Sequence, residues 1–107
     1  MKLDWDTDKE KANVKNHDGI YFSEAAKVFL DEWAIDEFDA QHSTVTEKRY
    51  TIIGLAENTL LRVTFAVTID EIGDEVFRII SARRAKGKDK IGYEQSRNKY
   101  EFRDDRY

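Results

Sequence analysis

Three arginines in and just after one expected strand are the residues of this sequence best suited to phosphate chemistry. Arg78, Arg83 and Arg84 lie in a segment with the apolar content of a buried strand. A guanidinium fork binds phosphate oxygens in pairs and keeps its charge, so we expect a polyanion site at this strand end. Regular alternation would place Arg83 on the face opposite to Arg78 and Arg84. The alternative is that some of these arginines pair with carboxylates of the acidic first half.

Two further side chains could transfer protons or hold a substrate beside such a site. RNA cleavage without a metal requires deprotonation of a 2′-hydroxyl, neutralisation of the growing phosphate charge, and protonation of the leaving 5′-oxygen. His17 follows the first expected helix and could act as a general acid or base, or it could simply cap that helix. Tyr93 could stack on or hydrogen-bond to a substrate, or it could be a half-buried residue of the last helix.

Other site chemistries find little support in the sequence. It has no phosphate-cradling glycine loop, no histidine pair of a zinc site and no nucleophile elbow. It contains two histidines and no cysteine, so a metal site would need carboxylates and no disulfide supports the fold. We expect neither a metal nor a cofactor.

Length and charge describe one small acidic domain with a basic end. The chain has 107 residues, 40% of them hydrophobic, and a net charge of −4. Residues 1–47 hold 5 Lys/Arg and 12 Asp/Glu, whereas residues 76–107 hold 10 and 5. The basic third could meet phosphates, although charged residues also keep a small protein soluble. No signal peptide or membrane-spanning run is present, so we expect a cytoplasmic protein without a membrane partner.

Two helices are expected early in the chain. Asp6 or Asp8 can cap a polar helix over residues 9–16, which Asp18-Gly19 would end. A second helix is expected from Ser23, its natural N-cap. Its apolar face follows the i, i+3, i+4, i+7 spacing of a helix and consists of Phe22, Ala25, Ala26, Phe29 and Trp33.

Strands fill the middle of the chain. Leu3 and Trp5 open it in a short strand-like segment, and a last helix begins at Gly87. β-branched and aromatic residues, with strict alternation in the third segment, predict further strands over residues 34–39, 49–55, 60–69 and 77–83. Short connections favour an antiparallel meander. We therefore predict one α+β domain over residues 1–107, an antiparallel sheet with two N-terminal helices and one C-terminal helix packed on it, and a charged tail over residues 97–107 that frays.

Four sequence blocks together resemble a known family. They are Trp5-Asp6 with Lys9, Asn13 and His17; Phe22-Ser23-Glu24-Ala25-Ala26 with Val28-Phe29 and Asp31; Glu47 and Arg49 ahead of Gly54; and Arg78-Ile79-Ile80-Ser81-Ala82-Arg83-Arg84-Ala85 with Tyr93-Glu94. In this order and spacing they resemble the BrnT family of bacterial type II toxins over about residues 3–95. The chain departs from the family pattern at Asn16-His17-Asp18-Gly19, where Lys-His-Gly is usual, and at Arg83-Arg84, where Arg-Lys is usual.

The resemblance implies a RelE-like fold and RNA cleavage that arrests growth. It also implies a BrnA-like antitoxin that neutralises the toxin in a hetero-oligomer. In that complex the antitoxin, and not the toxin, contacts operator DNA. Together with the physical argument, the family's recurrent polar positions give a catalytic set of His17, Arg49, Arg78, Arg83 and Tyr93. Lys15, Arg84, Lys86 and Lys88 complete the expected RNA contacts.

A rival interpretation comes from another class of protein. The chain could be a non-catalytic module that binds a protein or a nucleic acid through its basic last third, on the same scaffold. Its net acidity and the altered surroundings of His17 favour this alternative.

Overall fold

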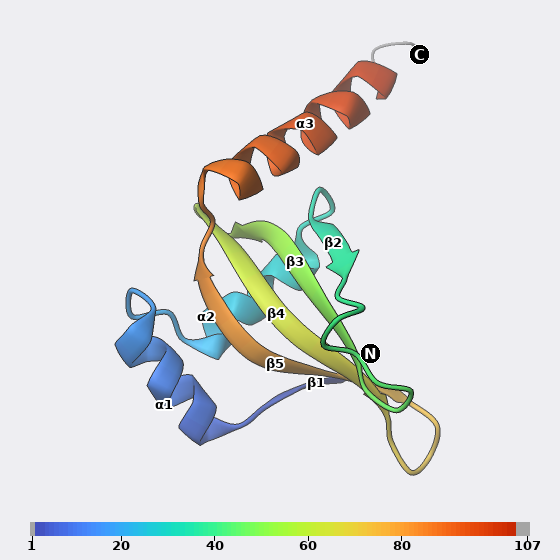
Figure 1. Ribbon diagram of the computed structural model, residues 1–107. Coiled ribbons are helices and arrows are strands. Elements are labelled where there is room, and N and C mark those ends of the chain that lie inside the picture. Colours follow the sequence, from blue (N-terminus) through green and yellow to red (C-terminus); the bar gives the residue numbers. More distant parts are fainter. Residues whose placement is uncertain (1, 105–107) are drawn as a thin grey trace.

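The chain folds into a five-stranded sheet with helices on one face and a long helix at one end (Figure 1). This computed structural model describes residues 2–104, with side chains as far as Lys99. The strands are β1 (Lys2–Trp5), β2 (Ile35–Phe38), β3 (Lys48–Ala56), β4 (Thr59–Ile69) and β5 (Glu75–Arg84). The helices are α1 (Thr7–Asn16), α2 (Phe22–Ala25), the 3₁₀ helix η1 (Ala26–Leu30) and α3 (Gly87–Asp104).

The sheet has the order β1-β5-β4-β3-β2. The predicted meander is confirmed, because β3, β4 and β5 pair antiparallel in sequence, and β2 pairs antiparallel with β3 at one edge. The prediction of a wholly antiparallel sheet was wrong, since β1 lies parallel to β5 at the other edge. Its four residues pair with a strand about 74 positions away in the chain, as Asp4 opposite Arg78 shows. No local turn signal could indicate that partner.

One face of the sheet, the helix face, is covered by α1, α2 and η1 (Figure 1). Its core consists of buried apolar side chains from the helices and the strands: Ile20, Phe22, Ala25, Val28, Ile52, Ala56, Leu61, Val63, Phe65, Ile79 and Ala82. The Phe65 ring stacks between Tyr50 and Phe77, with ring centroids 5.5 Å away on each side. This apolar layer holds the three central strands to the helices.

α1 is fixed to the sheet by one buried amide. Asp6 caps the helix as predicted and accepts hydrogen bonds from the backbone N–H groups of Asp8 and Lys9. The Asn13 side chain donates to the carbonyl oxygens of Ile20 and Ala82, at 3.0 and 2.9 Å, and accepts from the Ala82 N–H at 2.9 Å. It therefore takes the place of a neighbouring strand at the edge of β5, beyond the end of β1.

The second predicted helix is shorter and tighter than expected. α2 ends at Ala25 and continues as the 3₁₀ helix η1, and Tyr21, not Ser23, occupies its N-cap position without a side-chain bond. Phe22, Ala25 and Val28 are fully buried at the three-residue spacing of a 3₁₀ helix, so Trp33 lies outside the predicted stripe. The tighter 3₁₀ turn allows this segment to pack closely on Gly54. A Cβ added to Gly54 would lie 3.0 Å from the Ala34 Cβ.

α3 packs on the sheet only near its start. Tyr93 is buried there with Ile53 and Ala85, and the rest of the helix extends away from the sheet (Figure 1). Residues 97–104 of the predicted tail continue α3, and residues 105–107 lie outside the described part of the chain. None of the helices within residues 2–104 is both long and apolar enough to cross a membrane.

Candidate active site on the open sheet face

A β-bulge in β5 brings Arg78 and Arg83 to the same face of the sheet. Thr64 of β4 pairs with Ser81, but the next residue, Phe65, pairs with Ile79, so Ile80 is an extra residue in β5. An extra residue reverses the alternation beyond it. The prediction that Arg78 and Arg83 point to opposite faces was therefore wrong, because it assumed a regular strand.

The face opposite α1, α2 and η1, which we call the arginine face, carries three rows of paired residues and is covered at one end by the start of α3, where Tyr93 packs on Ile53. Directly paired residues of neighbouring strands point to the same face. The middle row holds the carboxylate of Glu37 at its β2 end and then three hydroxyl side chains, and it runs Glu37–Thr51–Thr64–Ser81. The rows on either side hold the arginines and run Arg49–Ala66–Arg78–Asp4 and Ile35–Ile53–Arg62–Arg83. Neighbouring rows are about 7 Å apart along the strands, so a line of hydroxyl groups lies between two pairs of guanidinium groups.

Asp89, near the start of α3, holds one of these arginine pairs in place. Its carboxylate accepts hydrogen bonds from Arg62 at 3.0 Å, from Arg83 at 3.1 Å and from the Lys86 N–H at 2.9 Å. Burial alone would raise the pKa of Asp89, but these hydrogen bonds together lower it below its ordinary value. A carboxylate that stays charged can separate two like charges that the strand register places side by side.

The other arginines keep looser partners. Arg49 pairs through Nε with Glu47 at 3.2 Å, and Arg78 pairs with the exposed Asp4 at 3.2 Å. The Arg49, Arg62 and Arg83 side chains are 33%, 32% and 31% exposed, respectively. Each can therefore reach a phosphate while a carboxylate fixes its position.

Arg84 points away from this site. It pairs with Leu61, a core residue of the helix face, and its Nε lies 3.9 Å from an Asp18 carboxylate oxygen. The predicted RNA contacts at Lys15, Lys86 and Lys88 are all exposed. Lys15 lies in the last turn of α1, Lys86 lies in the connection from β5 to α3, and Lys88 lies in the first turn of α3.

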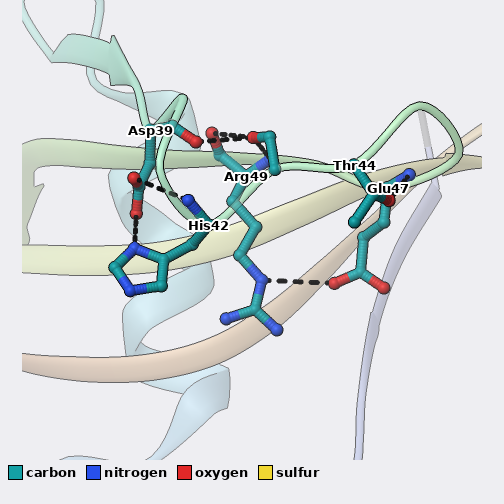
Figure 2. Close-up of polar contacts among 6 residues, drawn as sticks. Asp39, His42, Thr44, Glu47 and Arg49 are labelled. Atoms are coloured by element: carbon teal, nitrogen blue, oxygen red, sulfur yellow. Dashed lines mark hydrogen bonds and ion pairs between the residues drawn. The ribbon is translucent and has the colours of Figure 1, made fainter.

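The loop between β2 and β3 holds a histidine and a carboxylate that the sequence had not singled out. The His42 Nδ1 lies 2.8 Å from Asp39 Oδ2, and the His42 N–H donates to the other Asp39 oxygen at 3.2 Å. Partial burial tends to raise the pKa of Asp39, but the hydrogen bonds from His42 lower it overall. Figure 2 shows the His42 ring of the loop and the Arg49 guanidinium of β3 extending in the same direction.

A cavity of about 400 Å³ joins this loop to the arginine face. Asp39 and His42 line its loop side, and Glu37, Thr51 and Arg62 line its sheet side. The cavity thus places the imidazole at the β2 end of the hydroxyl row.

His17 lies at the opposite edge of the sheet. It forms the C-cap of α1, where its N–H donates to the Asn13 carbonyl at 2.8 Å, as the capping alternative predicted. Its side chain lines a pocket of about 270 Å³ between α1 and the Ile80–Ser81 segment. Within residues 2–99 the His17 ring makes no hydrogen bond or ion pair.

Tyr93 is buried where α3 packs on the sheet. It is 4% exposed, and its hydroxyl donates to Asp31 Oδ2 at 2.7 Å. Burial and the neighbouring Asp31 carboxylate raise the pKa of Tyr93 to about 12. Asp31 also accepts from the N–H groups of Leu55 and Trp33, so this cluster joins α3 to the β3 end and the turn after η1.

The fold and the site define a class: a small α+β protein with ordered arginines and hydroxyl groups on one sheet face and a carboxylate-bound histidine in an adjoining loop. The family comparison is more specific. The sequence model of the BrnT family, the ribonuclease toxins of type II toxin–antitoxin systems, matches residues 5–89. The chain therefore belongs to the BrnT family, and the resemblance noted in the sequence is confirmed. Among curated proteins, no match was found.

Proposed function

We propose that this chain is an endoribonuclease that binds and cleaves RNA on the arginine face without a metal. The family supplies the reaction class, ribonuclease toxin. The observation that carries the location is the row of hydroxyl groups between the Arg49–Arg78 and Arg62–Arg83 pairs. In this proposal the guanidinium groups neutralise the charge that grows on the scissile phosphate, a task that needs fixed donors rather than a cofactor.

The arrangement supports this role through the partners that fix each arginine. Arg62 and Arg83 are held by the buried Asp89, and Arg49 is held by Glu47. A donor already held in place loses little freedom when the phosphate charge develops. The exposed Lys86 and Lys88 extend the positive surface toward α3 and would add salt-dependent affinity for the RNA backbone.

The cellular role follows from the family. A type II toxin acts together with a protein antitoxin, and we propose a BrnA-like antitoxin that forms a hetero-oligomer with this chain and carries its DNA-binding segment. Cleavage of cytoplasmic RNA would arrest growth until the antitoxin is restored.

Induced expression with RNA analysis tests the proposal. The wild type should arrest growth and degrade RNA, and Arg83→Ala should abolish both effects. Arg84→Ala is the matched control, since it removes the same side chain from the next residue on the other face. The purified wild type should also cut RNA in the presence of a chelator. Normal growth with intact RNA would contradict the proposal, and RNA binding without cleavage would favour the binding-module alternative.

A further inference from the structure

The sequence contains two histidines, and the structure places one at each end of the hydroxyl row. The chemistry proposed above needs one group to take the proton of a 2′-hydroxyl. We infer that His42, oriented by Asp39, is that group, an inference that rests on the proposed ribonuclease function. His17 then has no part in proton transfer.

The contact with Asp39 determines which nitrogen of the neutral His42 ring carries the proton. A carboxylate accepts hydrogen bonds, so the 2.8 Å contact with Nδ1 places the ring proton on that nitrogen. The lone pair of the neutral ring is then on Nε2, which makes no hydrogen bond to any group of residues 2–99. A histidine base in a nucleophile–base–carboxylate arrangement is oriented in the same way.

The loop that carries His42 is held by its own hydrogen bonds. The Ser43 hydroxyl donates to the Asp39 carbonyl at 2.6 Å and accepts from the Arg49 N–H at 2.8 Å. The Asp39 N–H donates to the Arg49 carbonyl at 2.8 Å, and the Thr44 N–H to the Glu47 carbonyl at 2.8 Å. These bonds tie the loop to the first residues of β3, while the Asp39 and Glu47 carboxylates hold the imidazole and the Arg49 guanidinium.

The shared cavity relates the base to the phosphate. His42 and Arg62 line the same cavity as Thr51, which belongs to the hydroxyl row. A phosphate bound by Arg62 at this end of the row would have its neighbouring ribose beside the loop. His17 lies beyond β5 at the other end, and the row between them crosses β3, β4 and β5. At about 5 Å per strand, the two histidines cannot serve one phosphate together.

The step that follows is internal transesterification. Nε2 of His42 takes the proton of the 2′-hydroxyl, and the O2′–phosphorus bond forms as the phosphorus–O5′ bond breaks. The electron pair leaves on O5′, which takes a proton from water, and His42 returns its proton to the resulting hydroxide. The products are a 2′,3′-cyclic phosphate and a free 5′-hydroxyl, so no other reactant is consumed.

The test compares the two histidines in the same assay. Wild type, His42→Gln and His17→Gln are given an RNA that carries one mapped cleavage site, with ribosomes supplied if cutting requires them. His42→Gln should lower kcat by about 100-fold or more and leave KM unchanged, and His17→Gln should leave both within about threefold. Added imidazole should restore part of the activity of His42→Gly.

A second variant separates proton transfer from folding. Asp39→Asn keeps an oxygen that can accept the loop N–H bond but removes the charge beside Nδ1, so kcat should fall by about tenfold or more with the unfolding temperature unchanged. The inference is overturned if His42→Gln retains its kcat within about threefold of the wild type, or if His17→Gln shows the larger loss. A wild type that cuts no RNA would overturn the proposed function and the inference with it.

Discussion

The two faces of the sheet are made by the same strands, yet their side chains have different tasks. On the helix face, the buried polar side chain of Asn13 is fixed by three hydrogen bonds. On the arginine face, each guanidinium is fixed by a carboxylate and remains partly exposed. The bulge at Ile80 separates these roles within β5. One extra residue lets the strand give Ile79 and Ala82 to the core and both Arg78 and Arg83 to the other face.

The largest expected effect comes from removing Arg49 and Arg78, the two arginines of the row that ends at Asp4. Replacing Arg49 and Arg78 together by alanine should slow RNA cleavage by about 1,000-fold or more, since each fixed donor to a developing charge is worth about 100-fold. The free energy of unfolding should change little, because both ion pairs are at or near the surface. Cleavage assays and thermal unfolding of the same variant check this. Cleavage at the wild-type rate would contradict the assignment of catalysis to the arginine face.

The helix face should respond in stability and not in catalysis. Asn13→Ala removes three buried hydrogen bonds and should lower the free energy of unfolding by about 3 kcal/mol. Denaturant titration measures the loss. Cleavage per folded molecule should stay at the wild-type level, and a selective loss of cleavage by a stable variant would mean that α1 belongs to the active site.

Asp89 holds one arginine pair of the arginine face and should give a pH-dependent effect. Asp89→Asn removes the charge that Arg62 and Arg83 share, so it should cost about 2 kcal/mol of stability near neutral pH. The pKa of Asp89 is lower in the folded chain than the ordinary value near 4. Its contribution is therefore complete above pH 4 and is lost as the pH falls through the folded pKa. Unfolding curves of both proteins should converge at low pH, and a constant difference would contradict this account.

The smallest effect is expected at Tyr93. Tyr93→Phe deletes the hydrogen bond to Asp31 and should cost about 1 kcal/mol, with cleavage unchanged. Because the pKa of Tyr93 is raised to about 12, the phenol's contribution is complete below pH 10 and is lost as the pH rises from there through 12. Alkaline unfolding of the two proteins checks this, and loss of cleavage in Tyr93→Phe would restore a catalytic role for the residue.

Local patterns predicted those parts of the fold that local patterns control. Alternation indicated the three central strands, and Asp6 and Asp18-Gly19 marked the ends of α1. The 3₁₀ turn at η1 was missed because close packing on Gly54 determines it. The place of β1 was missed because its partner is distant in the sequence.

The site was harder to predict for the same reason. Arg83 and Arg78 were identified by residue type, but the bulge that unites them depends on pairing between β4 and β5. Arg62 alternates with core residues along β4, and Asp89 lies in the first turn of α3. No local sequence pattern indicates that these two side chains meet. The spacing of Asp39 and His42 was the one local signal, since an acceptor three residues before a histidine can reach its ring in a turn.

Mapping the RNA-binding surface tests the central claim most directly. The full chain is titrated with 2′-O-methyl RNA, which lacks the attacking hydroxyl, and backbone amide shifts are followed by NMR. The account predicts that the largest changes fall on Thr51, Thr64 and Ser81 and on the loop around His42. Changes confined to α1, α2 and η1 would show that RNA binds elsewhere and would contradict the assignment of the arginine face.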